Sequence, residues 1–347
     1  MSSINIPKVA EDAIRETPKW ARPLGTDPRL ELVSCDEPFT RYRTIVDLLC
    51  IPETDPSVRK QRELVLSDER VKSLINSLPK DWSSYLVKGH DKSDYPPSVL
   101  LLLFDFGVKP TDDQRIDDLL NQMKSLQDDN GRFLSLARFP KKQPELGSNL
   151  CDTHIITETL LLGCYQNSKE VRNALAFITD HLKVTNQGIA WKCEPNSVNN
   201  ARGPGKRDDI CPQVTLEALR LFSLLSEDMR PKNLVTAGKV ILSCWERSKE
   251  ERPYMFGHGT RFRKLRPPFF WYNIGEVLDT LSRYQVLSKE PAFQDMLSVV
   301  ISNADKKGHF TPESTYREFK DWSFGQKKEW SPWTTFFICR ILKRVYG

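Results

Sequence analysis

The sequence contains no apolar run long enough to cross a membrane. Its longest uninterrupted apolar stretch is Val99–Phe104, whereas a membrane-spanning helix needs about 20 predominantly apolar residues. The first 24 residues carry Glu11, Asp12 and Glu16 between their apolar positions, so they lack the hydrophobic region of a secretory signal peptide. We therefore expect no membrane span and a cytoplasmic location.

An excess of charge of one sign is also lacking. The chain has 51 Lys and Arg against 46 Asp and Glu, a formal charge of +5 over 347 residues. This balance is too even to predict nucleic-acid binding by itself. No proline- or serine-rich linker divides the chain, so we expect one domain over residues 1–347, although this length could also form two average domains.

A disulfide framework is not expected, because eight cysteines are an odd set for one in so long a chain. In a reducing compartment they should be core thiols or metal ligands. Cys50, Cys164 and Cys339 fall within apolar helical stretches, and a buried free cysteine behaves as a small hydrophobe. These three are predicted to pack in the core.

What the sequence does have is helical periodicity with a long repeat. Apolar residues recur at spacings of three and four, which predicts helices. Every second helix begins after steps of 58, 53, 62, 60 and 60 residues, near Pro38, Pro96, Asn149, Cys211, Trp271 and Ser331. Such a period predicts a repeated pair of helices.

The two helices of each pair differ in character. One is apolar almost all round and should be buried, whereas the other has a charged face and should meet water. We therefore expect an all-α fold with inner and outer helices. Residues 1–37 would supply an outer helix (residues 8–20) and a lead-in, and residues 38–347 the helical-hairpin repeats, which gives six inner and six outer helices.

Three turns between repeats share a glycine placed two or three residues before an aromatic residue: 127–133, 185–191 and 305–310. The glycine supplies a positive φ for a tight turn, and the aromatic ring should fill the gap between helix pairs. Because such turns return the chain to one end of the molecule, all inner helices should begin at the same rim.

This pattern resembles the α/α-toroid superfamily, which includes protein prenyltransferase β subunits and squalene/hopene cyclases. It is similar in particular to prokaryotic proteins labelled prenyltransferase or squalene-oxidase repeat proteins. The resemblance covers most of the chain and implies an (α/α)6 toroid with a substrate in its central cavity. The segments that carry it are Arg41–Leu49, Cys151–His154, Asp209–Cys211, Phe269–Tyr272, Trp322–Gly325 and Ser331–Thr335.

The chain departs from these relatives in informative ways. The Asp-x-Asp-Asp motif of the cyclases and their Gln…Trp repeats are absent, so protonation of the squalene type is not expected. Protein prenyltransferases hold zinc with an Asp-x-Cys pair and a later histidine, to which Asp209, Cys211 and His258 correspond. Lys206 precedes Asp209 by three residues, as in that family, but Pro212 replaces the aromatic residue that should follow the cysteine.

Cysteine and histidine also gather near the starts of the inner helices. Cys151 and His154 lie in the first turn of the third inner helix, Cys193 ends the turn before the fourth, Cys211 begins the fourth, and His258 precedes the fifth. Zinc prefers thiolate and imidazole ligands. The pattern predicts a rim zinc site of the three cysteines and one histidine, as an alternative to the set implied by the resemblance. The alternative is that these are unrelated polar and core residues that bind no common ligand.

Basic residues lie beside the same rim. Arg202 and Lys206 precede the fourth inner helix, and Arg261, Arg263 and Lys264 precede the fifth. Together with helix N-termini they could bind an anion such as a diphosphate, and could stabilise it as a leaving group. Alternatively they are solvated loops. Nucleic-acid binding is not expected, because no nucleic-acid motif accompanies them.

Aromatic residues begin the last two inner helices. Trp271, Tyr272 and Trp333 are expected to line the cavity, where they could stabilise a cation. Trp271 and Trp333 are assigned to substrate binding, and Tyr272 to catalysis together with Asp152 and Asp209. Glu158 is a further carboxylate available for acid–base chemistry.

Several functions stay open from the sequence. The leading one is a transferase or cyclase of prenyltransferase type, acting on an isoprenoid or another apolar small molecule, with zinc as cofactor. Another is a zinc-dependent, thiol-activating cyclase resembling lanthipeptide cyclases, whose Cys-His-Gly signature this chain lacks. A third is a non-catalytic toroid that binds a peptide or lipid, with structural zinc. Glycoside-processing toroids need two facing carboxylates, which the sequence alone does not place.

Overall fold

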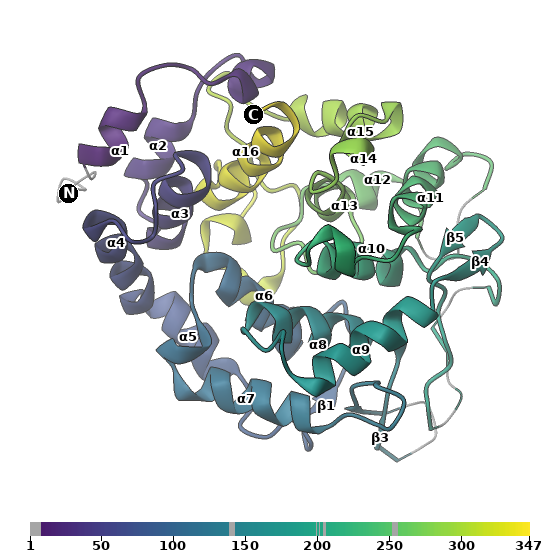
Figure 1. Ribbon diagram of the computed structural model, residues 1–347. Coiled ribbons are helices and arrows are strands. Elements are labelled where there is room, and N and C mark those ends of the chain that lie inside the picture. Colours follow the sequence, from purple (N-terminus) through teal and green to yellow (C-terminus); the bar gives the residue numbers. More distant parts are fainter. Residues whose placement is uncertain (1–7, 139–142, 199, 201, 204–205, 252–255) are drawn as a thin grey trace.

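The computed structural model describes residues 8–138, 143–198, 200, 202–203, 206–251 and 256–347 (Figure 1). Of the predicted lead-in, residues 1–7 lie outside this range. The described chain is mostly helical, and none of its helices is long and apolar enough to cross a membrane.

One set of helices is buried on nearly every face. It comprises α3 (Pro38–Arg43), α6 (Pro96–Phe106), α8 (Leu150–Leu162), α10 (Pro212–Phe222), α13 (Ile274–Leu281) and α16 (Pro332–Tyr346). Each contacts the next in this order, and α16 also contacts α3. Their starts lie within three residues of the predicted ones. Most begin with proline in the first turn, where its fixed φ and missing N–H cost nothing.

A second set buries mainly one stripe of each helix and lies outside the first (Figure 1). It comprises α4 (Pro56–Ser67), α5 (Glu69–Ser77), α7 (Gln114–Ser125), α9 (Lys169–Asp180), α11 (Leu234–Glu246) and α15 (Pro291–Ile301). In α7 the stripe is Ile116, Leu119, Leu120 and Met123, at the spacing of an amphipathic helix.

Short elements connect the two sets. They are α1 (Lys8–Ala13), η1 (Lys19–Leu24), α2 (Arg29–Ser34), the π-helix η2 (Thr44–Leu48), η3 (Pro110–Asp112), η4 (Glu227–Met229), α12 (Thr260–Arg263), α14 (Gln285–Ser288), η5 (Arg317–Phe319) and η6 (Ser323–Gly325). Strand β1 (Leu86–Val87) pairs parallel with β2 (Ser135–Ala137), which pairs antiparallel with β3 (Glu145–Gly147); β4 (Lys183–Thr185) pairs antiparallel with β5 (Gly188–Ala190).

The glycine–aromatic turns have the predicted form. Gly131, Gly188 and Gly308 all adopt a positive φ, and the aromatic residues that follow are fully buried. In each turn the aromatic N–H donates to a threonine hydroxyl in the first turns of the next buried helix. These pairs are Phe133 to Thr153 (3.2 Å), Trp191 to Thr215 (3.2 Å) and Phe310 to Thr335 (3.0 Å). The repeat therefore extends to individual hydrogen bonds.

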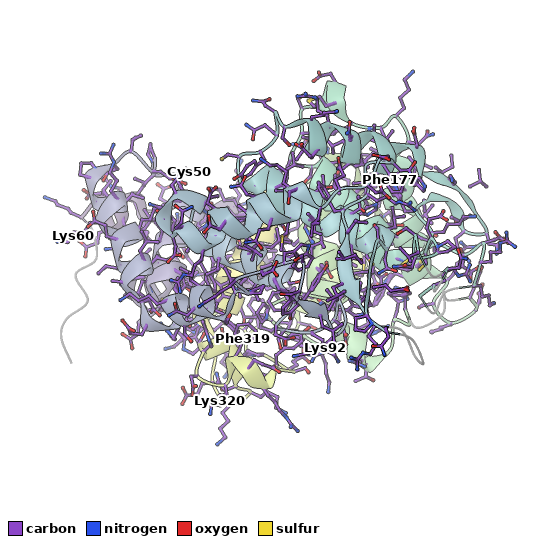
Figure 2. All side chains as sticks on the ribbon, turned by 90° about the horizontal axis from the view of Figure 1, so that it is seen from below. Cys50, Lys60, Lys92, Phe177, Phe319 and Lys320 are labelled. Atoms are coloured by element: carbon purple, nitrogen blue, oxygen red, sulfur yellow. The ribbon has the colours of Figure 1, made fainter. Side chains whose placement is uncertain are left out.

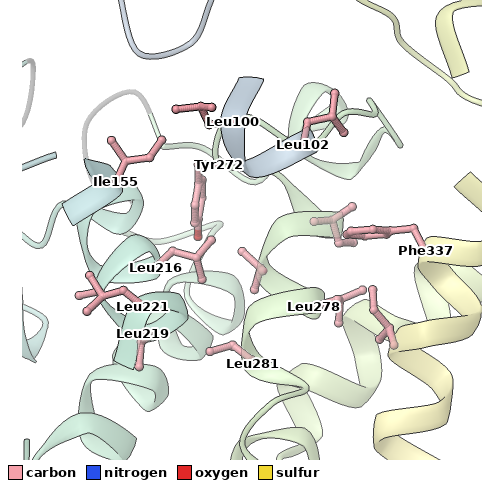
Figure 3. Packing of buried hydrophobic residues seen from close by; sticks show 14 of the residues in the cluster. Leu100, Leu102, Ile155, Leu216, Leu219, Leu221, Tyr272, Leu278, Leu281 and Phe337 are labelled. Atoms are coloured by element: carbon pink, nitrogen blue, oxygen red, sulfur yellow. The ribbon is translucent and has the colours of Figure 1, made fainter. Parts of the chain in front are cut away.

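One hydrophobic cluster extends along the chain from Ala10 to Leu342. Figure 3 shows part of it, where Leu216 and Leu219 of α10 lie beside Leu278 and Leu281 of α13. Because the buried helices contact one another on both sides, their apolar faces are removed from water almost all round.

Several predicted helices are wrong in extent. The helix expected over residues 8–20 is divided into α1 and η1, because Pro18 has no N–H to continue a helix. Apolar residues recur with helical spacing over residues 59–78 and predict one helix there, but the structure breaks it at Asp68, whose side chain accepts the N–H of Arg70 and starts α5. Cys50 and Cys164 are exposed, at positive φ just beyond helix ends, whereas Cys339 is buried as predicted.

Candidate functional site

A cavity of about 660 Å³ lies between the buried helices. Side chains from α6, α8, α10, α13 and α16, and from the segment formed by α3 and η2, line it together with residues 268–270. Its size falls within the range of small-molecule sites, roughly 300–1,000 Å³. These buried helices thus share one cavity.

Part of the wall is apolar and aromatic. Phe269 and Phe337 stack with ring centroids 4.2 Å apart, and Trp333, Leu102 and Ile155 also line the cavity. Trp333 is 1% exposed, so its ring is fixed by packing. This wall suits a ligand with an apolar body.

Beside the apolar wall, Arg220 of α10 bridges two buried carboxylates. Its Nε donates to both oxygens of Glu158 (2.6 and 2.8 Å), and its Nη1 donates to Oε1 of Glu276 (2.7 Å). The guanidinium is 13% exposed and each carboxylate side chain is 4% exposed. One cation therefore holds carboxylates from α8 and α13 in the cavity wall.

Glu276 has unused hydrogen-bonding capacity, as Asp47 of the same lining and Glu217 also do. Its Oε2 is buried without a hydrogen-bond partner, while its backbone N–H is fixed by Oδ1 of Asn273, the N-cap of α13 (3.1 Å). Burial raises the pKa of Glu276 to about 7, against the opposing effect of Arg220, because desolvation disfavours the charged form. Glu276 can therefore exchange a proton near neutral pH.

Glu217 lies on α10, the helix of Arg220. Like Glu276 it is a buried carboxylate, but it does not line the cavity. It is 2% exposed, and its Oε1 accepts a hydrogen bond from Gln213 Nε2 (2.8 Å). Burial raises its pKa to about 8. It provides a comparison for Glu276.

A second charged cluster surrounds Asp279. Its Oδ1 accepts from Arg344 (2.8 Å) and its Oδ2 from Arg283 (2.9 Å), while Arg340 pairs with both Asp279 and Asp105. Although burial opposes this, the three guanidiniums hold the pKa of Asp279 well below its usual range. This carboxylate is committed to ion pairs and stays ionised.

The charges that line the cavity nearly cancel. Six cationic and five anionic residues leave a formal excess of one positive charge; they are Arg43, Arg220, Arg283, Arg340, Lys343 and Arg344 against Asp47, Asp105, Glu158, Glu276 and Asp279. The cavity is more highly charged than most ligand pockets, which are lined mainly by apolar side chains.

The three predicted zinc-binding cysteines lie near one another. Burial raises the pKa of Cys151, and Asp152, Glu217, Cys193 and Cys211 raise it further. Cys193 and Cys211 belong to adjoining segments, because the N–H of Cys211 donates to the carbonyl of Trp191 (2.9 Å). The Sγ of Cys193 accepts the N–H of Gly203 (3.2 Å).

The two predicted histidine ligands have other partners. Nδ1 of His154 bonds to the carbonyl of Val214 (2.9 Å) inside the core, and burial lowers its pKa to about 3. Nε2 of His258 bonds to the hydroxyl of Tyr272 (2.9 Å), and burial lowers its pKa to about 4. Both are neutral histidines in mainly aromatic surroundings.

The histidine beside Cys151 is His90, which the sequence prediction omitted. Both of its ring nitrogens are 3.7 Å from Cys151 Sγ, and its Nε2 is 2.5 Å from Asp152 Oδ1. Asp152 also accepts from Tyr95, Ser135 and Asn149. The signal was present, because His90 precedes α6 by six residues and so lies close to the start of an inner helix.

Zinc is implied by the resemblance, and its ligand set stays a prediction. Within the described ranges, no three His, Cys, Asp or Glu side chains form a group that could hold a metal ion. His154 and His258 each use one ring nitrogen in a hydrogen bond, and the other nitrogen of each ring is buried without a hydrogen-bond partner. A zinc site of the three cysteines therefore stays a prediction, and no chemical step is assigned to it.

The predicted catalytic residues do not line the cavity. Asp152 is 0% exposed and engaged as described above. Asp209 accepts from Asn186 (2.9 Å) and Gln187 (3.2 Å), so it holds the β4–β5 turn. Tyr272 is buried against His258 and does not line the cavity.

The predicted anion-binding residues also lie elsewhere, except Trp333. Arg263 packs over Trp245 at 4.5 Å, and Arg261 is exposed on the short helix α12. Lys264, Trp271, Arg202 and Lys206 are absent from the cavity lining described above. The cations of the cavity instead come mainly from within the buried helices, where isolated charges among apolar residues were an available signal.

Comparison with known proteins adds no relative: no protein-family model matches the chain, and no curated protein matches it.

Proposed function

We propose that this chain is an (α/α)6 toroid and an enzyme that acts on an amphipathic small molecule of isoprenoid type, with Glu276 as its acid–base group. The observation that carries the proposal is the unpartnered Oε2 of Glu276 in a cavity with an aromatic wall. Each buried helix contacts the next along the chain, and the last one, α16, contacts the first one, α3. This closed series of contacts supports the toroid.

The division of the cavity wall supports an amphipathic ligand. Phe269, Phe337 and Trp333 offer apolar contact, while Glu276 offers a hydrogen-bond acceptor, or a donor when it is protonated. Because five carboxylates offset all but one of the six cations, the proposal favours a ligand whose polar end is uncharged, such as an alcohol or a carbonyl, over a diphosphate.

Arg220 and Glu158 would act as positioning residues. Arg220 keeps the carboxylate of Glu276 in one orientation through Oε1 and leaves Oε2 for the ligand. Glu158 accepts two hydrogen bonds from the same guanidinium, which fixes its plane. A carboxyl group with a pKa near 7 suits proton transfer, because it can both give and take a proton at neutral pH.

Calorimetric titration with isoprenoid alcohols and diphosphates of several chain lengths tests the binding. We expect an alcohol to bind more tightly than the diphosphate of the same length. Leu101→Trp places a larger ring in the cavity lining and should weaken binding at least about tenfold. Val184→Trp is the matched control, because Val184 is 77% exposed on β4. No heat with any isoprenoid would refute the proposed ligand class.

Deuterium incorporation from heavy water into the bound ligand tests the acid–base role. Glu276→Gln should slow it about 100-fold or more while binding stays within a factor of three or so. Glu217→Gln should leave the rate unchanged, because Glu217 lies outside the lining. Tight binding without any exchange in the wild-type protein would make the toroid a non-catalytic binder.

A further inference from the structure

Two reactive side chains from opposite parts of the chain meet beside the cavity. Lys343 of α16 places its Nζ 2.7 Å from the Sγ of Cys50. Cys50 is exposed, and Figure 2 shows it at the surface of the molecule. The thiol is therefore open to small oxidants while it touches an amine.

The contact is held from both sides. Nζ of Lys343 also donates to the carbonyl oxygens of Asp47 (2.5 Å) and Leu48 (3.2 Å) at the end of η2. Cys50 follows η2 with a φ of 58°, which turns its side chain away from the continuation of the helix. A lysine side chain is usually mobile, but here several acceptors fix its terminal nitrogen against one sulfur atom.

The separation is short for a hydrogen bond to sulfur. N–H···O bonds span about 2.7–3.2 Å, and sulfur is larger than oxygen, so an N–H···S bond should be longer than these. The 2.7 Å between Nζ and Sγ exceeds a direct bond between nitrogen and sulfur but can be spanned by one bridging atom. We propose that Cys50 and Lys343 form an oxidative cross-link in which a single oxygen atom joins Sγ to Nζ.

Dioxygen is the oxidant in this reaction. The ammonium group of Lys343 first releases a proton to solvent. The S–H bond of Cys50 and one N–H bond of the amine then break, and an S–O bond and an O–N bond form. One oxygen atom of dioxygen becomes the bridge, and the other leaves as water with the two hydrogen atoms. Cysteine oxidation generally proceeds through such S–O species.

The cross-link would join residues 293 positions apart and so tie η2 to the last helix, α16. It would also remove the positive charge of Lys343 from the cavity lining. Closing so long a loop restricts the unfolded chain, so the oxidised protein should melt at a higher temperature. This inference is independent of the proposed enzymatic function.

Peptide mapping of the full chain by mass spectrometry tests the cross-link. The protein is reduced with dithiothreitol without oxygen and then divided between aerobic and anaerobic buffer. We expect a linked peptide pair containing Cys50 and Lys343 only in the aerobic sample. Its mass should equal the sum of the two peptides plus one oxygen and minus two hydrogens, and renewed reduction should remove it.

Cys164→Ser is the matched control, since Cys164 is also exposed, at a φ of 69°, just after a buried helix. This variant should keep the linked pair, whereas Cys50→Ser and Lys343→Arg should each lose it. Aerobic wild-type protein should melt above the reduced form, and the two forms of Lys343→Arg should melt together. Overturning results would be no linked pair, oxidation of Cys50 to sulfinic acid alone, a bridge without oxygen, or a link that survives Lys343→Arg.

Discussion

Glu217 and Glu276 are buried carboxylates that differ mainly in their access to the cavity. Burial raises the pKa of Glu217 to about 8 and that of Glu276 to about 7, above the ordinary value of about 4.3. The folded state therefore holds their protons more tightly than the unfolded state. Their contribution to stability is complete below about pH 4 and is lost as the pH rises towards 7 or 8.

A titration of stability follows from these pKa values. The free energy of unfolding of the wild-type protein should fall between about pH 5 and pH 7. In Glu276→Gln that fall should be smaller, by on the order of 1–2 kcal/mol, because glutamine does not ionise. Urea denaturation followed by circular dichroism at each pH measures the effect.

Glu217→Gln is a second variant for this titration. It should also flatten the pH dependence, because both carboxyl groups are buried and have raised pKa values. Asp279, whose pKa is lowered, loses its contribution only as the pH falls below the ordinary carboxyl range, outside this window. An unchanged slope in Glu276→Gln would contradict the raised pKa of Glu276.

Residue identities at the candidate site were only partly predictable. The sequence analysis named Glu158 and Trp333, which line the cavity, but also Asp209 and Tyr272, which do not. Asp209 and Tyr272 lie near helix starts but contact other partners, because the direction of a side chain at that point depends on the neighbouring helix. Glu276 and Arg220 form an ion pair although they are 56 positions apart in the sequence, and no local sequence pattern predicts such a contact.

At the scale of the element, the repeated bond between turn and helix can be tested directly. Thr215 Oγ1 accepts the N–H of Trp191 (3.2 Å) and donates to its carbonyl (3.0 Å). Thr215→Val keeps the shape but leaves this buried N–H without a partner. The cost should be about 1–3 kcal/mol, measured by urea denaturation.

Thr159→Val serves as the comparison. Thr159 is equally buried, and its hydroxyl donates to the carbonyl of Ile155 in the same helix (2.7 Å). That carbonyl keeps its helical hydrogen bond after the substitution, so the cost should stay below about 1 kcal/mol. Equal costs for the two variants would mean that the turn bond adds nothing beyond packing.

Helix existence was more predictable than helix extent. Periodicity located the starts of α6, α8, α10 and α16 well, since apolar spacing and an initial proline or asparagine agree there. The prediction failed where a single side chain diverts the backbone, as at Asp68 and Pro18. Such breaks depend on one local hydrogen bond, or on one missing N–H, and periodicity averages over them.

At the scale of the whole molecule, Arg340 connects elements distant in sequence. It pairs with Asp105 of α6 and Asp279 of α13 from its position on α16, and its side chain is 9% exposed. Arg340→Met removes the cation and leaves buried carboxylates with fewer partners. We expect a loss of about 3 kcal/mol in the free energy of unfolding, measured by urea denaturation.

Lys239→Met is the matched variant at the surface. Lys239 pairs with Glu290 at 2.8 Å, but the two side chains are 54% and 31% exposed. Solvent-exposed pairs contribute roughly 0–1 kcal/mol, so this substitution should have little effect. If Arg340→Met lowered the free energy of unfolding as little as Lys239→Met, the ion pairs of Arg340 would not stabilise the fold.

The predominance of helix and the repeat spacing could be predicted because both follow from local apolar patterns. The ionic character of the cavity could not, because Arg340 and Asp279 meet only after α13 and α16 pack together. In the sequence they are isolated charges among the apolar residues of two helices. The packed structure makes them mutual partners, which is the form in which buried charges are tolerated.

The contacts of α16 also bear on how the protein is made. This helix touches η1, α2 and α3, which leave the ribosome long before it does. Until α16 has been synthesised, the first helices expose the apolar surface that it covers, and partly folded chains of this kind are prone to aggregate. A chaperone that shields this early segment should therefore raise the yield of native protein more than one that acts after release.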